Sequence, residues 1–356
     1  MTRILFIGDL RPHSRSAQRL SALRGAGHEV RAISTVQIDL PPPDGRPARL
    51  SDRVRHRLGV PSDRLKASHQ LVRAVSLDPR YDLLWVEKAL CLRPWALRRA
   101  RVSEPDLRVV FFSEDDMLPR ANGSLWFRRA LPLYDVVLTT KSFNARPEEL
   151  PSLGARRVEA LHKSFDPDVY RPLEVTDEDR ERLGARVGFI GTYERERAAS
   201  LLTLARAGIE VRVFGNGWER LDERHPGLRV ERRPVYGDDY VRAVCATDVN
   251  LGFLRRANRD QHTDRSVEIP ACGGFLLAER SDEHSALFKE GREAEFFASD
   301  GELVEKVRRY LDEPERRANV AAAGRARCLA GGYRHVDWLA RALALVGCPV
   351  PMERAA

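Results

Sequence analysis

The sequence has few cysteines and no long apolar run. None of its apolar stretches approaches the roughly 18 residues that a membrane-spanning helix needs, and the run that follows Met1 is too short for a secretory signal peptide. The five cysteines are widely spaced and include no Cys-x-x-Cys pair, which argues against a disulfide framework and against a zinc site. We therefore expect a cytoplasmic protein with reduced thiols and no bound metal.

Aromatic residues are also scarce, at 7% of the 356 residues, and only six of the 60 cationic residues are lysine. The apolar content of 43% and the charged content of 31% are typical of a globular protein and exclude collagen-like, coiled-coil and wholly disordered chains. The length suits two domains. The net charge of +8 favours partners that carry phosphate, but no nucleic-acid-binding motif accompanies it, so we expect no nucleic-acid partner.

Short apolar runs alternate with amphipathic stretches along the whole chain. This alternation predicts an α/β protein with parallel sheets covered by helices on both faces. The expected strands are residues 4–8, 30–34, 83–86, 109–112, 136–139 and 158–161 in the first half, and 187–190, 211–214, 249–252, 275–277 and 295–297 in the second. The expected helices include residues 16–24, 95–100, 194–207, 237–246, 265–271, 283–289, 300–311, 314–329 and 333–346.

The pattern predicts two doubly wound, Rossmann-like domains, over residues 1–165 and 166–332. A polar crossing at 162–172 marks the boundary, and the terminal helix within 333–356 is expected to pack back towards the first domain. Ligands of open α/β sheets bind outside the carboxyl ends of the strands. We therefore expect the functional site in a cleft where these edges of the two domains face each other.

Residues 41–66 interrupt the alternation with several prolines followed by basic residues. They predict a proline-rich loop that leads into a basic surface helix. One interpretation is a solvent-exposed loop without a binding role. The other is an electrostatic contact with an anionic acceptor or with an anionic membrane surface, at which the protein would be peripheral.

A glycine turn follows the first predicted strand of the second domain. Gly191 and Thr192 end the strand, and Arg195 and Arg197 lie at the start of the next helix. Free backbone N–H groups with an arginine beside them suit a phosphate or diphosphate group. The alternative is that Gly191 only makes a turn.

The segment 258–277 carries the most informative pattern. A polar loop with Asp260 leads into a short helix with Arg265 and Glu268, and the Gly273–Gly274 turn then leads into an apolar strand. A carboxylate on such a helix can accept hydrogen bonds from both hydroxyls of a ribose. An ordinary ion pair within the helix, between Arg265 and Glu268, is the alternative.

Three acids, Glu114, Asp115 and Asp116, follow a strand of the first domain. They are candidates for binding or deprotonating a hydroxylated acceptor, although acids also stabilise a helix N-terminus without any further role. Two histidines, His13 and His262, fall in predicted loops near the cleft. A loop histidine is usually only exposed, so neither is assigned a role.

Taken together, these segments resemble the GT-B glycosyltransferases. The resemblance rests on Phe-Asp-Pro-Asp-Val-Tyr-Arg-Pro at 165–172, on Arg-Ser-Val-Glu-Ile-Pro-Ala-Cys-Gly-Gly at 265–274, and on the helices from Glu302 to Tyr333. It covers nearly the whole of residues 80–340. The branch that the sequence resembles most is the spore-maturation (CgeB-type) group related to families 1 and 4.

The resemblance implies roles for individual residues. Glu268 matches the second acid of the family's Glu-x7-Glu motif, which holds the donor ribose, and Asp260 takes the place of the first acid, beside the donor sugar. Arg197 stands where relatives have a diphosphate-binding lysine. Thr192 stands where they have an arginine, so that Arg265 or Arg195 is expected to supply the second cation. Relatives also carry a sugar-contacting histidine where this chain has residues 113–116.

The resemblance also implies an activity, the transfer of a hexose-type sugar from a UDP- or GDP-sugar to a hydroxyl of a glycan, a lipid-linked glycan or a small molecule. Retention of configuration and independence of metal and cofactor are expected with it. The alternative is a protein that binds nucleotide sugars but has lost catalysis. Expected catalytic residues are Asp260, Glu114 and Asp115; expected donor-binding residues are Gly191, Thr192, Arg195, Arg197, Arg265, Glu268, Gly273 and Gly274, with a helix start expected near Gly273.

Overall fold

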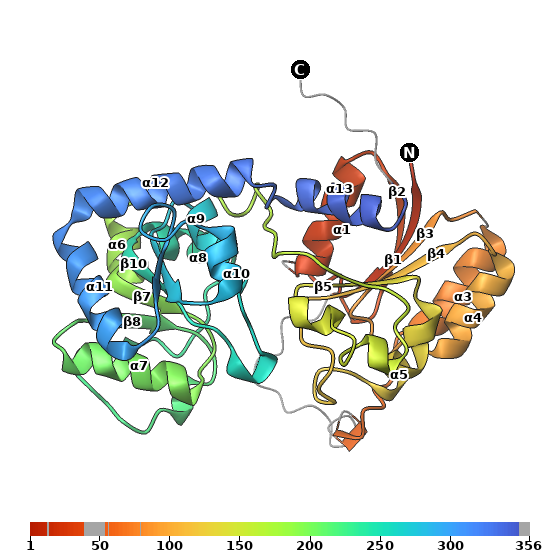
Figure 1. The fold of residues 1–356 in the computed structure, drawn as a ribbon, viewed down its shortest axis with the longest axis horizontal. Coiled ribbons are helices and arrows are strands. Elements are labelled where there is room, and N and C mark those ends of the chain that lie inside the picture. Colours follow the sequence, from red (N-terminus) through yellow and green to blue (C-terminus); the bar gives the residue numbers. More distant parts are fainter. Residues whose placement is uncertain (13, 39–53, 56, 79, 349–356) are drawn as a thin grey trace. The chain divides into compact units, whose positions relative to one another are not determined.

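The computed structural model describes residues 1–12, 14–38, 54–55, 57–78 and 80–348 (Figure 1). Contacts divide the chain into two compact units. Unit 1 comprises Met1–His162 together with His335–Ala356, and unit 2 comprises Lys163–Arg334. The boundaries that the sequence suggested, at residues 165 and 332, lie close to these divisions.

Unit 1 is built on a parallel six-stranded sheet with the strand order β2-β1-β3-β4-β5-β6. Its strands are β1 (Arg3–Gly8), β2 (Glu29–Ser34), β3 (Leu83–Glu87), β4 (Arg108–Ser113), β5 (Val136–Thr139) and β6 (Val158–Ala160). Its helices are α1 (Arg15–Gly25), α3 (Ala67–Leu77), α4 (Pro94–Ser103), α5 (Leu125–Ala130) and α13 (His335–Leu345), with short 3-10 helices at Leu131–Leu133, Ser142–Ala145 and Pro151–Leu153.

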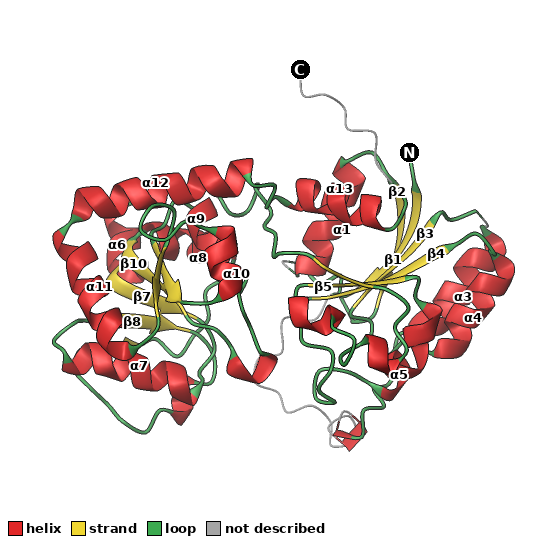
Figure 2. Ribbon diagram, in the orientation of Figure 1, coloured by secondary structure: helices red, strands yellow, loops and turns green. Residues whose placement is uncertain are grey.

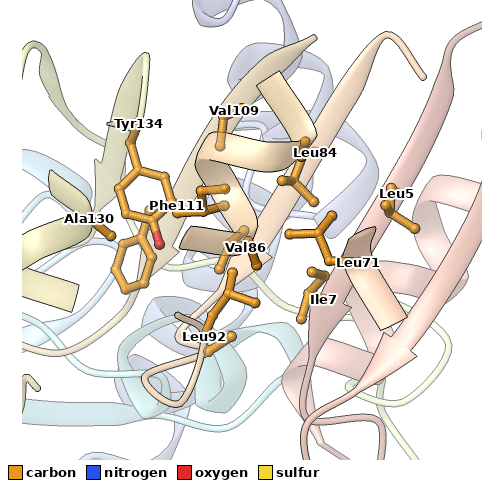
Figure 3. Packing of buried hydrophobic residues seen from close by; sticks show 14 of the residues in the cluster. Leu5, Ile7, Leu71, Leu84, Val86, Leu92, Val109, Phe111, Ala130 and Tyr134 are labelled. Atoms are coloured by element: carbon orange, nitrogen blue, oxygen red, sulfur yellow. The ribbon is translucent and has the colours of Figure 1, made fainter. Parts of the chain in front are cut away.

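Alternating side chains of these strands enter two cores, one on each face of the sheet. On one face Leu5 of β1 and Phe111 of β4 pack with α3, α4 and α5 (Figure 3). On the other face Phe6 of β1 and Phe112 of β4 pack with α1 and α13. Strands buried on both faces explain why the apolar runs are continuous.

Unit 2 repeats this plan with the strand order β12-β11-β10-β7-β8-β9, again with every pair parallel. Its strands are β7 (Ala185–Ile190), β8 (Val211–Phe214), β9 (Leu228–Val230), β10 (Thr247–Gly252), β11 (Leu276–Glu279) and β12 (Glu295–Phe297). Its helices are α6 (Asp177–Leu183), α7 (Arg195–Arg206), α8 (Gly237–Cys245), α9 (Arg265–Ala271), α10 (Asp282–Leu287), α11 (Asp300–Asp312) and α12 (Pro314–Ala330), with 3-10 turns at Trp218–Arg220 and Arg256–Asn258.

Helices cover both faces of the second sheet as well (Figure 2). Helices α7 and α11 pack with Val187 and Phe189 of β7 on one face. Helices α8, α9 and α10 pack with Leu276 and Ala278 of β11 on the other. Because β7 pairs with both β8 and β10, the connections that leave β7 and β10 go to opposite faces of the sheet. This change of direction is the switch point at which doubly wound sheets bind ligands.

The predicted α/β class with two doubly wound, Rossmann-like sheets is confirmed, and each predicted strand is present with ends that differ from the expected ones by about two residues or less. The sequence did not predict β9, a three-residue edge strand with an exposed arginine at its centre. It also left α3 unassigned, although this helix buries five residues against the sheet. Most of the predicted loop at 41–66, and His13, lie outside the described residues.

Two further expectations concern thiols and membranes. The five cysteines are free, and burial raises the pKa of the Cys272 and Cys328 thiols, which makes them inert. Within the described residues, none of the helices combines the length and the apolar character that crossing a bilayer requires.

A buried ion pair ties α1 to the sheet of unit 1. The Arg19 guanidinium, 2% exposed, donates from Nη2 to Glu87 Oε1 over 2.6 Å, and its carbon lies 4.8 Å from the ring centroid of Phe112. Glu114 Oε2 is a second, more distant partner of Arg19 at 3.5 Å. A buried ion pair contributes little relative to an apolar pair, but loss of one partner leaves the other charge uncompensated.

Replacing Arg19 by methionine keeps much of the side-chain volume but leaves Glu87 buried without its main cation. We expect Arg19→Met to lower the free energy of unfolding by about 3–5 kcal/mol, measured by urea titration. Arg157→Met is the matched control. It breaks an exposed pair with Glu159 and should cost about 1 kcal/mol or less. Equal costs for the two variants would contradict the importance of burial.

Candidate functional site

The carboxyl ends of β7 and β8 are tied together through Gly191. Its N–H donates to the carbonyl oxygen of Phe214 over 2.8 Å, and its own carbonyl accepts from Trp218 Nε1 over 2.8 Å. Tyr193 N–H donates to the carbonyl of Asn216 over 2.9 Å. The predicted glycine turn at 191 is therefore held rigidly at the switch point.

Gly215 makes this close approach of the two turns feasible. Its φ is +155°, and a Cβ placed on it would lie 1.9 Å from the carbonyl oxygen of Gly191. That oxygen belongs to the backbone and is fixed by Trp218. Only glycine therefore fits at position 215.

Arg197 lies in the first turn of α7, close to the glycine turn at Gly191–Thr192. Its side chain is 5% exposed, and Nη1 donates to the carbonyl of Thr192 over 3.1 Å. Glu194 Oε2 lies 3.8 Å from Arg197 Nε, beyond hydrogen-bonding distance. Among the described residues this buried Nε has no hydrogen-bond partner.

Arg265 approaches Arg197 from the first position of α9. The carbons of the two guanidinium groups each lie 5.8 Å from the centroid of the Phe189 ring. The buried Nε of Arg265 likewise finds no hydrogen-bond acceptor in the described part of the chain. We call Arg197 and Arg265 the cationic pair. Strand β7 carries Phe189. Arg197 lies on α7, which follows β7, and Arg265 lies on α9, which follows β10.

The acids around Arg197 do not fully compensate for its burial and its cationic neighbour. Burial and the nearby charge of Arg265 lower the pKa of Arg197 to about 10, although Glu194, Asp260 and Glu279 oppose this shift. Glu194 is shared, because its Oε1 also accepts from Arg255 Nε over 2.9 Å. A further anion at this position would therefore be stabilised.

The two acids that the sequence predicts for the donor site, Asp260 and Glu268, lie in the loop before α9 and in α9. Asp260 is half-buried, its Oδ1 accepts from Asn258 Nδ2 over 2.8 Å, and its charge acts on Arg197. Glu268 is 3% exposed, and its Oε2 accepts from the Tyr240 hydroxyl over 3.0 Å. Burial and Glu268 raise the pKa of Tyr240, whereas Arg265 lowers it. Glu268 and Arg265 thus share one environment, with Tyr240 between α8 and α9.

Other expected donor-binding residues lie apart from the pair. Arg195 is exposed at the start of α7, and residues two apart on a helix do not share a face with each other, so it points away from Arg197. The expected helix start near Gly273 is wrong. Gly273 and Gly274 follow the C-terminus of α9 and precede β11, at the amino edge of the sheet. A Cβ at Gly274 would lie 2.7 Å from Val244 Cγ1, so packing requires this glycine.

His262 is buried rather than exposed in a loop. Its Nε2 accepts from the backbone N–H of Lys163 over 2.9 Å, and Nδ1 lies 2.5 Å from Glu283 Oε2. Both ring nitrogens are engaged, so His262 is a structural residue. His284, which the sequence analysis did not single out, is also buried, and burial lowers its pKa to about 4.

The acids of unit 1 are already engaged in ion pairs. Glu114 pairs with Arg19 and Arg15, and Asp115 pairs with Lys88. Asp116 is fully buried, and its Oδ1 accepts from Asn144 Nδ2 over 3.0 Å. Of the three, Asp115 is the most exposed candidate for an acceptor contact. In the part of the chain that the structure describes, no three acidic, histidine or cysteine side chains converge to hold a metal ion.

Comparison with known proteins bears on both the fold and this site. Residues 195–344, from α7 to α13, match a family described as glycosyl transferase-like. No curated protein matches the sequence. Similar solved structures include α,α-trehalose 6-phosphate synthase from Burkholderia multivorans (TM-score 0.65, 14% identity, 98% of each chain covered) and sucrose-phosphate synthase from Thermosynechococcus elongatus (TM-score 0.64, 15% identity, 97% of each chain covered).

A third similar structure is that of Anabaena HepE in complex with UDP-glucose, with a TM-score of 0.60 and 13% identity over 98% of this chain and 100% of that chain. The fold is that of the GT-B glycosyltransferases. The expected GT-B fold is thereby confirmed, and the match at 195–344 covers the cationic pair and both acids of its site. Assignment to the CgeB-type branch stays a prediction.

Some residues around the cationic pair carry no signal in the sequence. Phe189 is one of several apolar residues in a strand, and Tyr240 is one of several buried residues in α8. Only the tertiary structure brings the Tyr240 hydroxyl to Glu268, which lies 28 positions later. Trp218, one of five tryptophans, follows a predicted strand, and a buried indole N–H generally needs a partner; the sequence alone does not identify that partner as Gly191.

Gly215→Ala tests the contact between the two turns. We expect it to destabilise unit 2 by about 2 kcal/mol or more, because the added Cβ meets a fixed carbonyl and the backbone conformation is strained for alanine. Gly208→Ala is the matched control. It has φ +80° but open space around its Cβ position, so it reports strain alone. Thermal unfolding measures both variants, and equal losses would argue against a steric requirement at Gly215.

His284 gives the protein an acid-sensitive stability. The unfolded residue titrates near 6.5 and the folded one at about 4. Between these values only the unfolded chain takes up the proton, so stability is fully present above 6.5 and falls as the pH approaches 4. Between about pH 7 and pH 4 the wild-type protein should lose roughly 3 kcal/mol more than His284→Phe. The free energy of unfolding of both proteins is measured by urea titration at a series of pH values. If it changed with pH equally in the wild type and in His284→Phe, His284 would not be the source of the acid sensitivity.

Proposed function

We propose that the protein is a glycosyltransferase that moves a sugar from a nucleoside diphosphate sugar to a hydroxyl group of an acceptor. The cationic pair carries the proposal. Two guanidinium groups lie against one aromatic ring, one of them has a depressed pKa, and each has a buried N–H for which the described residues provide no acceptor. A diphosphate brings the negative charge and the acceptor oxygens that this arrangement needs.

The same charges suit the chemistry of the reaction. As the bond from the sugar to the diphosphate breaks, positive charge develops on the sugar and negative charge on the departing diphosphate. Donors that are already oriented stabilise such developing charge at little reorganisation cost. Arg197 and Arg265 would act in this way on the leaving group, which makes a divalent ion unnecessary. We therefore include metal independence in the proposal, and we propose retention of configuration on the family resemblance.

The two acids take the remaining parts of the donor. Glu268, oriented by Tyr240, is proposed to accept hydrogen bonds from the ribose hydroxyls. Asp260 is proposed to contact the transferred sugar. The backbone at Gly191 and Thr192 is proposed to border the diphosphate, and Asp115 and Glu114 of unit 1 to contact the acceptor. The HepE complex with UDP-glucose supports a uridine donor, with guanosine as the alternative base.

Arg197→Ala tests the central residue. We expect kcat/KM for sugar transfer, or for donor hydrolysis, to fall about 100- to 1,000-fold, which corresponds to about 2.7–4 kcal/mol. Binding of UDP, measured by calorimetry in EDTA, should weaken while binding of uridine stays the same. Arg206→Ala, an exposed arginine at the other end of α7, is the control. Sugar transfer by Arg197→Ala at the wild-type rate would contradict the role assigned to Arg197.

A second candidate is a protein that binds nucleotide sugars without transferring them. It is favoured by the ion pairs that already occupy Glu114 and Asp115, and by Thr192 at the place of an expected cation. Binding of UDP-sugars with no product across many acceptors, and with no slow hydrolysis, would support it. Appearance of free UDP that depends on Arg197 would exclude it.

A further inference from the structure

The first turn of α10 contacts the loop that carries the donor-site residues. Ser281, the residue before α10, donates from Oγ to the carbonyl of Gln261. Glu283 contacts His262, and His284 contacts Ser266. These contacts join two connections at the carboxyl edge of unit 2, the one after β10 and the one after β11.

The hydrogen-bond directions at His284 follow from its partners. The Glu279 carbonyl accepts only, so His284 Nδ1 carries the proton and donates over 2.7 Å. At neutral pH the ring therefore accepts at Nε2, where Ser266 Oγ donates over 2.7 Å. Ser266 Oγ in turn accepts from the backbone N–H of Thr263 over 2.9 Å. These hydrogen bonds form a chain from the Thr263 N–H through Ser266 and His284 to the Glu279 carbonyl, and every donor in it points the same way.

Two residues of this chain, Ser266 and Glu279, are linked to the cationic pair. Ser266 follows Arg265 directly in α9. Glu279 acts electrostatically on Arg197, and its Oε2 accepts from Leu254 N–H at the end of β10. Packing alone does not require a histidine at position 284, since its ring stacks on Phe296 with an interplanar angle of 9°, which a phenylalanine would also do.

We propose that His284 is a positioning residue of the donor site, which holds the start of α9 so that the Arg265 guanidinium stays against Phe189 beside Arg197. This inference rests on the proposed function of the cationic pair as the diphosphate site. The two like charges repel each other, so α9 must be restrained from outside the pair. The hydrogen bond from Ser266 to His284 supplies that restraint at the residue next to Arg265.

The test compares the affinities of UDP and uridine for the full chain, by calorimetry in EDTA. His284→Phe keeps the stacked ring but loses both hydrogen bonds, and Ser266→Ala removes the same link from the other side. We expect each to weaken UDP binding about 10- to 100-fold, with uridine binding unchanged. Because the two variants break one link, the double variant should bind UDP no more weakly than either single variant.

Conservative variants separate positioning from general stability. A glutamine amide can reach the place of Nε2, whereas an asparagine amide can reach only that of Nδ1, so His284→Gln should recover UDP affinity and His284→Asn should not. Tyr310→Phe is the matched control. It removes a buried hydrogen bond to Glu295 at the amino edge of the same sheet and should leave the ratio of UDP to uridine affinity unchanged.

The outcomes distinguish the two proposals. A wild-type chain that binds neither UDP nor GDP overturns the proposed function and this inference with it. If the wild type binds UDP and Ser266→Ala and His284→Phe bind it equally well, only the positioning role fails. A parallel loss of UDP and uridine affinity would also overturn it, because that is the mark of general destabilisation. If His284→Phe does not fold, Ser266→Ala and His284→Gln decide by the same criteria.

Discussion

The fold of unit 2 holds two arginine side chains close together although their charges repel each other. The properties of the candidate site depend on this repulsion. Arg197 and Arg265 belong to different helices, each lies 5.8 Å from the Phe189 ring, and each has a buried N–H without an acceptor among the described residues. Burial and mutual repulsion lower the pKa of Arg197 to about 10. Such an arrangement costs free energy, and the anion that we propose would offset part of that cost.

The parallel sheet is what makes this arrangement possible. In unit 2 the chain leaves β7 towards one face and β10 towards the other, so α7 and α9 begin on opposite sides of the same strand end. Trp218 and the absence of a Cβ at Gly215 fix the turn between them. In α9, Glu268 accepts a hydrogen bond from Tyr240, and Ser266, the residue after Arg265, is hydrogen-bonded to His284. Arg197, Arg265 and Glu268 thus lie on helices, whereas Asp260 lies in the loop that precedes α9.

The sequence predicted the strands well because each is an apolar run buried on both faces of a parallel sheet, and the exceptions were short or flanked by polar residues, as in β9. For the proposed site, the sequence singled out Arg197, Arg265, Asp260 and Glu268, since charged residues after strands fall on the carboxyl edge; their roles stay predictions. It failed where a contact joins distant segments, as between Tyr240 and Glu268. It also failed at Gly273, because a glycine turn before a strand and one after a strand look alike in sequence but lie at opposite edges of the sheet.

Both units bury an arginine, and the acids around each arginine differ. Unit 1 also buries an arginine near the carboxyl edge of its sheet. Burial lowers the pKa of Arg19, but Glu87 and Glu114 outweigh that effect and raise it. Arg19 is therefore satisfied by the protein itself, in contact with Phe112 and Trp338. Arg197 has a similar burial and a similar aromatic neighbour, yet its nearest acid is 3.8 Å away and shared with Arg255. A phosphate group would therefore gain more from Arg197 than from Arg19, which is why we propose the diphosphate site in unit 2.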